Sequence, residues 1–163
     1  MIWDISTSYF TIINNTELRY DSITGFIWFF DRHIKMWTVK FCYEDSKYLK
    51  MRIGDKRYRH HRVMYKLFNP EWDIEDVSDD NKIDHKNQNK LDNNISNLRV
   101  VTTQENCFNR TAKGYYKNKN SDRWQAEITV NRKKIYLGLF KKEEDAHKAY
   151  LTAKKIHHVI RQS

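Results

Sequence analysis

The sequence predicts an α+β protein in which short antiparallel strands alternate with a few helices. Three observations support this fold class. Residues 123–130 and 133–138 alternate between apolar and polar side chains, which is the period of two expected for strands. Residues 61–68 and 143–156 carry apolar or small residues at helical spacing. Between them, residues 82–109 are expected to form a strand, a loop, a second strand and a helix.

The N-terminal third is expected to hold strands followed by one helix. Residues 20–25, Tyr-Asp-Ser-Ile-Thr-Gly, predict a turn that leads into an apolar strand over residues 26–30. The Gly54-Asp55 pair predicts a hairpin between strands at 48–53 and 56–58.

The helix of residues 61–68 should end before Pro70, because the residue that precedes a proline disfavours helical geometry. His60 and His61, at the start of this helix, are expected to be structural. Residues 71–80 hold six carboxylates. Such an acidic cluster is far more often a solvated loop than a metal site, so we expect it to link the helix to the next segment.

The distribution of charge points to a polyanionic partner. The net charge is +9 and the pI is about 9.5. Residues 1–109 hold 16 Lys+Arg and 16 Asp+Glu, whereas residues 110–163 hold 14 and 5, so all of the excess lies in the last third. A block this basic most often contacts nucleic acid, with a solvated basic face as the alternative. Residues 47–62 are a second basic segment, for which phosphate contact and a solvated hairpin are equally expected.

Size and composition allow one domain or two small ones, since 39% of the 163 residues are hydrophobic. Cys42 and Cys107 are isolated, which indicates neither a zinc site nor a disulfide framework. The first residues lack the pattern of a signal peptide, and no apolar run approaches the roughly 18 residues of a membrane helix. We expect a soluble, intracellular monomer with no membrane contact and no small-molecule cofactor.

The most informative stretch spans residues 82–110. Asp84 and His85 would end a strand, and residues 98–101 would form the apolar return strand. The Asn-rich segment between them would be the loop. An Asp-His pair in a polar loop is common, and Asn-rich runs are usually turns, so the pair alone does not establish a site.

The residues after the second strand complete the pattern. Thr102 and Glu105 predict a capping box, which starts a helix and puts Asn106 in its first turn. His85 suits a general base, because the unperturbed pKa of histidine, about 6.5, leaves it partly neutral near pH 7. The Asp84 carboxylate and the Asn106 amide suit a hard cation such as Mg²⁺, which prefers oxygen ligands and keeps several waters.

These residues resemble the HNH (His-Me finger) endonucleases, and most closely the phage homing endonucleases whose motif ends in Asn rather than His. Asn97 follows His85 by 12 positions and Asn106 follows it by 21, and both spacings fit that family. The resemblance implies a ββα-metal unit in which His85 is the general base and Asn97 positions the loop and the imidazole. It also implies that Asp84 and Asn106 bind one divalent cation, Mg²⁺ or Mn²⁺. A loop-bracing asparagine and a catalytic orienting one look the same in the sequence.

The last third is expected to form three strands, at 114–116, 123–130 and 133–138, and a helix at 143–156. The faces of the strands follow from the alternation. The residues expected inward are Trp124, Ala126, Ile128, Val130, Ile135 and Leu137; those expected outward are Gln125, Glu127, Thr129, Lys134 and Tyr136. Ala146, Ala149, Tyr150 and Ala153 give the helix a small-residue face that can pack closely on the sheet.

These segments resemble the plant Apetala and ethylene-response-factor type of DNA-binding domain, which also occurs attached to phage HNH nucleases. The signatures are Gly114-Tyr115-Tyr116, Trp124-Gln125-Ala126-Glu127-Ile128, Leu137-Gly138-Leu139-Phe140 and Glu144-Asp145-Ala146-His147-Lys148-Ala149-Tyr150. In that family the sheet enters the major groove of double-stranded DNA. Carried over by position, Tyr116, Gln125, Glu127, Thr129, Lys134 and Tyr136 would face DNA, and Arg123, Arg132 and Lys133 could anchor phosphates. Plant members have Arg where this chain has Tyr116 and Thr129, so we expect a different base preference.

We therefore expect an HNH nuclease domain over residues 1–109, with its finger in 82–109, and a DNA-binding domain over 110–163. The expected function is metal-dependent cleavage of DNA by a phage or mobile-element homing endonuclease, acting in the host cytoplasm. The alternative is a sequence-specific DNA-binding regulator with an inactive nuclease motif, against which the intact motif argues. An RNA-acting or toxin-like nuclease is a third reading, weakened because no translocation or immunity segment is visible.

Overall fold

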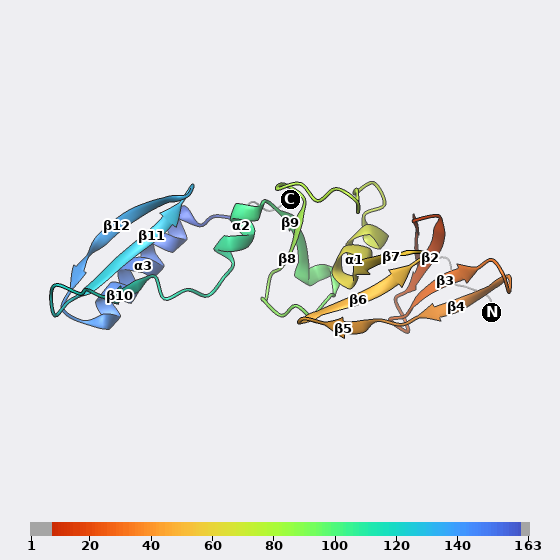
Figure 1. Cartoon of the computed structure of the whole chain (residues 1–163), viewed down its shortest axis with the longest axis horizontal. Coiled ribbons are helices and arrows are strands. Elements are labelled where there is room, and N and C mark those ends of the chain that lie inside the picture. Colours follow the sequence, from red (N-terminus) through yellow and green to blue (C-terminus); the bar gives the residue numbers. More distant parts are fainter. Residues whose placement is uncertain (1–7, 161–163) are drawn as a thin grey trace. The chain divides into compact units, whose positions relative to one another are not determined.

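The computed structural model describes residues 8–160, and the chain divides into two compact units. One unit holds the chain up to Ser78 together with Ile83–Arg99. The other holds Asp79–Lys82 and the chain from Val100 onward. The small antiparallel sheets and few helices agree with the α+β class (Figure 1). The domain boundary expected after residue 109 stays a prediction.

The first unit begins with a four-stranded antiparallel sheet in the order β1-β2-β3-β4. Its strands are β1 (Ser8–Ile13), β2 (Thr16–Asp21), β3 (Ile27–Asp31) and β4 (Met36–Lys40). β1 and β2 join through Asn14 and Asn15, which both have positive φ. Asparagine tolerates this conformation better than most residues, and it suits a two-residue hairpin. This hairpin was not predicted from the sequence.

The turn predicted at residues 20–25 is present between β2 and β3. The Asp21 carboxylate accepts hydrogen bonds from the Ile23 amide at 2.9 Å and from the Thr24 hydroxyl at 2.6 Å. Gly25 has a φ of +73°, a conformation that glycine adopts without strain. The local chemistry of Asp, Thr and Gly therefore sets where β2 ends.

A second, three-stranded antiparallel sheet precedes the first helix. It consists of β5 (Tyr43–Asp45), β6 (Tyr48–Ile53) and β7 (Lys56–Arg59), and α1 (His60–Phe68) follows directly. The hairpin predicted at Gly54 and the helix predicted before Pro70 are both confirmed. α1 buries Val63, Met64 and Leu67. This helix therefore supplies much of the core of the first unit.

The acidic segment after α1 is held by cations of that helix. Arg62 Nη2 donates to the main-chain carbonyl oxygens of Ile74 at 2.6 Å and Asp76 at 2.7 Å. Lys66 Nζ donates to the carbonyl of Trp72 at 2.8 Å. The segment is therefore a loop pinned through its backbone to α1, and it leads the chain to the next strand.

The central elements are β8 (Lys82–His85), the 3₁₀ turn η2 (Ile95–Asn97), β9 (Leu98–Val101) and α2 (Thr103–Phe108). β8 and β9 form a two-stranded sheet. The predicted capping box is confirmed: Thr102 Oγ1 accepts from the Glu105 amide at 3.1 Å, and the Thr102 amide donates to Glu105 Oε2 at 2.9 Å. This cap begins α2 directly after β9.

The second unit contains the sheet β10-β11-β12 and the helix α3. The bounds are β10 (Tyr115–Lys117), β11 (Trp124–Val130), β12 (Lys133–Phe140) and α3 (Glu143–His157). α3 lies along one face of the sheet (Figure 1). The core there contains Ile128, Tyr150 and Ala153, with Leu137 packed against it. Ile135, expected inward, is 36% exposed, because β12 is an edge strand.

No helix among residues 8–160 has the length and apolar character needed to cross a membrane.

Candidate functional site

Asp84 and His85 end β8 as buried polar residues, 6% and 5% exposed. Asp84 Oδ2 accepts two hydrogen bonds from the Arg99 guanidinium, from Nε at 3.0 Å and from Nη2 at 2.7 Å. Arg99 lies on β9, which pairs with β8. No role was predicted for Arg99 from the sequence. Its only signal was a charged residue inside a short apolar strand.

The His85 ring bonds to a residue of the Asn-rich loop. His85 Nε2 lies 2.9 Å from Asn93 Oδ1, and Asn93 Nδ2 lies 2.9 Å from His60 Nδ1. An amide oxygen only accepts and an amide nitrogen only donates, so this orientation of the Asn93 amide calls for a hydrogen on Nε2 of His85 and for an acceptor at Nδ1 of His60. In neutral His85 the lone pair therefore lies on Nδ1. Asn93 was not among the predicted site residues.

Two further histidines surround His85. The His61 ring meets the His85 ring edge-on, with centroids 5.0 Å apart and planes at 86°. Burial lowers the pKa of His60 to about 4, and burial together with the nearby His85 lowers the pKa of His61 to about 3. Both rings are thus neutral at pH 7. The imidazole that packs against His85 is therefore uncharged.

Asn97 braces the loop between β8 and β9. Its Oδ1 accepts from the Asn87 amide at 3.0 Å, and its Nδ2 donates to Asn87 Oδ1 at 3.0 Å and to the Asp92 carbonyl at 2.8 Å. Its own carbonyl accepts from the Lys86 amide at 2.9 Å. The hydrogen bonds of Asn97 therefore go to the loop, which is the bracing arrangement. A part in catalysis stays a prediction.

Asn106 lies in the first turn of α2, where its amide donates to the Thr102 carbonyl at 3.0 Å. It belongs to the second unit, whereas Asp84, His85 and Asn97 belong to the first. Their joint site stays a prediction. One buried carboxylate and one amide suit a hard cation that keeps most of its waters. Within the described part of the chain, no group of three or more His, Cys, Asp or Glu side chains could hold a metal ion.

The side chains expected to face DNA share the face of the C-terminal sheet opposite α3. Cross-strand neighbours on that face include the pairs Glu127 with Tyr136 and Thr129 with Lys134. A chain of hydrogen bonds links them. Gln125 Nε2 donates to the Tyr116 hydroxyl at 2.6 Å, that hydroxyl donates to Glu127 Oε2 at 3.2 Å, and Lys134 Nζ donates to Glu127 Oε1 at 2.6 Å.

This network sets the charge of the face. The hydrogen bond from Lys134 lowers the pKa of Glu127, so the carboxylate stays ionised. Arg123 is exposed just before β11, and Arg132 and Lys133 are exposed at the turn after it. The three cations thus stand at opposite ends of β11. Contact of these residues with DNA stays a prediction.

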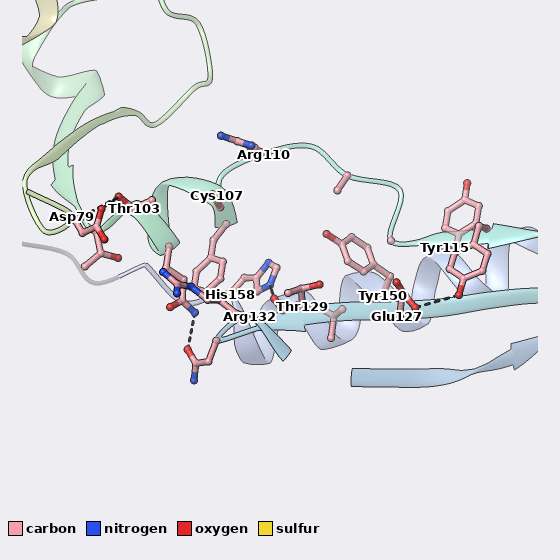
Figure 2. A pocket seen from close by; sticks show the side chains of 18 of the residues that line it. Asp79, Thr103, Cys107, Arg110, Tyr115, Glu127, Thr129, Arg132, Tyr150 and His158 are labelled. Atoms are coloured by element: carbon pink, nitrogen blue, oxygen red, sulfur yellow. Dashed lines mark hydrogen bonds between the residues drawn. The ribbon is translucent and has the colours of Figure 1, made fainter. Parts of the chain in front are cut away.

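A cavity of about 840 Å³ lies in the second unit beside β11 (Figure 2). The Phe108 and His158 rings stack there with centroids 4.1 Å apart, and His158 Nε2 donates to the Thr129 carbonyl at 3.0 Å. The lining mixes acidic and basic residues and therefore favours no one class of ligand. None of the residues predicted to be catalytic or to bind metal lines this cavity.

Comparison with known proteins identifies one segment of the chain. Residues 58–107 match the family model described as HNH endonuclease. The matched segment runs from β7 through α2, so it contains the His85 environment and the loop braced by Asn97. Neither a search of curated proteins nor a search of solved structures gave a match. The family match supports an HNH nuclease in this part of the chain, with DNA as the substrate of such a domain.

Proposed function

We propose that this protein is a metal-dependent endonuclease that hydrolyses phosphodiester bonds of double-stranded DNA, of the phage or mobile-element homing kind. One observation carries the proposal: the buried His85, beside Asp84, turns Nε2 to the Asn93 amide oxygen at 2.9 Å inside the segment that matches the HNH family. This contact favours a hydrogen on Nε2. Nδ1 is then the nitrogen that can take a proton. This is the state required of a general base.

In this mechanism His85 removes a proton from the attacking water at Nδ1, and hydrolysis proceeds without a covalent enzyme intermediate. Asn97 keeps the loop and hence the imidazole in place. Asp84 and Asn106 would hold one Mg²⁺ or Mn²⁺. When bound, the cation supplies positive charge to the phosphate oxygens and to the departing oxygen.

The C-terminal residues 110–163 would recognise DNA through the sheet face opposite α3. The resemblance to Apetala-type domains and the positive charge of this segment support that assignment. Tyr116, Glu127 and Lys134 would read bases, because side chains on a sheet can enter the major groove. Arg123, Arg132 and Lys133 would contact phosphates, which orient a protein on DNA without reading its sequence.

A second candidate function is a DNA-binding regulator with an inactive nuclease motif. The ion pair between Arg99 and Asp84 favours it, because the guanidinium already neutralises the carboxylate that would bind the cation. In a regulator, Arg99 would neutralise the buried carboxylate permanently. In a nuclease, binding of the cation and DNA would have to compete with this pair.

The deciding experiment is incubation of supercoiled plasmid with the protein, with and without Mg²⁺ or Mn²⁺. Nicked or linear plasmid that forms only with the cation supports the nuclease. The matched control is Asp80→Ala, an acidic side chain at an exposed position, which should cut like the wild type. DNA binding in a gel shift without cleavage at any cation concentration would establish the regulator instead.

A further inference from the structure

Three buried or half-buried side chains from distant segments form a continuous hydrogen-bonded row. His60 begins α1, His85 ends β8, and Asn93 lies in the loop that follows β8. Asn93 is 7% exposed and lies 33 positions from His60 in the chain. Its amide bonds to one nitrogen of each ring, at 2.9 Å in both cases. The Asn93 amide thus links the two imidazoles.

The amide has two unlike ends, so it forces opposite roles on the two rings. With Oδ1 toward His85, the Nε2 atom of His85 must donate and the Nδ1 atom of His60 must accept. If the amide turned over, its nitrogen would donate to His85 Nε2. The hydrogen of neutral His85 would then move to Nδ1 and the lone pair would leave that atom.

The acceptor role of His60 is consistent with its surroundings. Burial lowers its pKa to about 4, so the ring is neutral near pH 7 and keeps a lone pair for the amide nitrogen. A cationic His60 would carry a hydrogen on both nitrogens and could not accept from the amide. A neutral His60 with its hydrogen on Nε2 can therefore accept from the amide nitrogen, which leaves the amide oxygen turned toward His85.

We propose that Asn93 is a positioning residue that holds His85 in the tautomer with hydrogen on Nε2, and that His60 holds the Asn93 amide in the required orientation. This inference rests on the proposed function in one respect, namely that His85 acts as the base. Asn93 acts through His85 rather than on the substrate.

The same row explains how Asn97 can affect the position of His85 through Asn93. Asn97 Nδ2 donates to the carbonyl of Asp92, the residue directly before Asn93. The brace therefore fixes the backbone from which the Asn93 side chain projects. Asn97 therefore fixes where the Asn93 side chain lies, and His60 fixes which end of its amide faces His85.

The first test is structural and uses the full chain. Two-bond ¹H–¹⁵N correlation spectra of the ¹⁵N-labelled protein distinguish a histidine with hydrogen on Nε2 from one with hydrogen on Nδ1. His85 should show the Nε2–H form in the wild type, and a mixture of both forms in Asn93→Ala and in His60→Ala. Asn93→Asp keeps an oxygen acceptor and a similar volume, so it should retain the Nε2–H form. The matched control is Asn94→Ala, which removes the exposed neighbouring amide that caps η2 through the Ser96 amide.

The second test is kinetic. Asn93→Ala should lower kcat for plasmid cleavage by about tenfold to a hundredfold, the range typical of removing a partner that orients a reacting group. KM for DNA should stay within about twofold, because the buried amide does not face the substrate. Asn93→Asp should restore most of the rate.

The two proposals fail in different ways. If the wild-type protein cuts no DNA with any cation, the proposed function falls, while the spectra still decide whether the row sets the His85 tautomer. If His85 carries its hydrogen on Nδ1, the proposed role of Asn93 and His60 is ruled out, even if the protein is an active nuclease. The same holds if Asn93→Ala or His60→Ala leaves the tautomer of His85 unchanged. An equal tautomer mixture in Asn93→Ala and Asn93→Asp would rule out that role as well.

Discussion

Arg99 donates two hydrogen bonds to a single oxygen of Asp84, from Nε at 3.0 Å and from Nη2 at 2.7 Å. The carboxylate is buried, and the Arg99 side chain is 20% exposed. A buried carboxylate needs a positive partner, because its charge loses the solvation of water. In this structure Arg99 provides that partner, and in the proposed nuclease it shares the carboxylate with the cation.

Replacing Arg99 should therefore lower both the stability of the fold and the metal concentration that cleavage requires. Arg99→Met is expected to lower the Mg²⁺ concentration for half-maximal cleavage, because the guanidinium no longer competes with the metal for the charge of Asp84. Without metal, Arg99→Met should destabilise the fold by about 3 kcal/mol, the lower part of the range for breaking a buried pair.

Asp84→Ala and Asn106→Ala should abolish metal-dependent cleavage. Metal titrations and thermal unfolding measure these effects, with the exposed Arg32→Met as control. An unchanged metal requirement in all three site variants would exclude the assigned ligands.

His85→Ala should abolish cleavage and leave DNA affinity within about twofold. The reason is that the proposed base and the excess positive charge of residues 110–163 lie in different parts of the chain. Plasmid nicking and gel shifts on the same preparations measure the two properties. His33→Ala, at an exposed hairpin, is the matched control and should cut normally. Normal cutting by His85→Ala itself would end the nuclease proposal.

The sheet face opposite α3 should carry DNA affinity. In a full-length His85→Ala background, Lys134→Ala and Arg132→Ala should weaken binding, each lowering the salt slope by about 0.9 if it removes one phosphate contact. Glu127→Ala releases Lys134 from its ion pair and should mainly change the preferred sequence, since a carboxylate can accept from cytosine. Gel shifts across salt concentrations and a target library measure both. Lys155 is exposed in the last turn of α3, and Lys155→Ala should bind DNA like the parent. If Lys155→Ala weakened binding as much as Lys134→Ala and Arg132→Ala, the interface would lie elsewhere.

Stability should fall with acid because His60 and His61 are held neutral. Their pKa values in the fold, about 4 and about 3, lie below the ordinary value of 6.5. The unfolded chain binds protons at these sites first, so their contribution is complete above about pH 6.5 and is lost progressively as pH falls toward those folded values. Each histidine can contribute about 1.4 kcal/mol per pH unit in that window.

His61→Gln removes one such group and should flatten the pH dependence of the free energy of unfolding between pH 6.5 and 4.5. The wild type and the variant share all their carboxylates, so the difference between their two curves isolates the histidine. Thermal or urea unfolding at several pH values provides the measurement. Parallel curves would show that His61 is protonated equally easily in both states.

Gly114 should be the least replaceable of the glycines. A Cβ there would lie 1.9 Å from Cδ2 of the Tyr150 ring, and φ is +71°. Gly25 has a similar φ of +73° but nothing within 4 Å, so Gly25→Ala measures backbone strain alone, about 1 kcal/mol. Gly114→Ala should cost clearly more, because α3 or the backbone must shift. Calorimetry of both variants tests this; equal losses would mean that Tyr150 moves aside freely.

Much of the local structure was predictable because it depends on residues that are close in the chain. The capping box needs only Thr102 and Glu105. The turn at Gly25 depends on Asp21 and Thr24, and the hairpin at Gly54 depends on its own positive φ. The β1–β2 hairpin was missed, although Asn14 and Asn15 form its turn, because two asparagines also fit many irregular loops.

The candidate site was predictable only in part. The spacing of Asp84, His85, Asn97 and Asn106 is a property of the sequence, and it carried the resemblance to HNH nucleases. The partners of these residues were not predictable. Arg99 reaches Asp84 across 15 positions through the pairing of β8 and β9, and the joint placement of Asp84 and Asn106 remains a prediction.

The sequence by itself determined which chemical groups are present, at which spacing, and where helices and turns begin, because these follow from side-chain chemistry and short-range backbone preferences. Tertiary structure alone decided which groups are buried together. His60 meets Asn93 across 33 positions, and folding leaves the Asn93 side chain only 7% exposed. Burial makes their hydrogen bond obligatory, and that bond orients the amide toward His85.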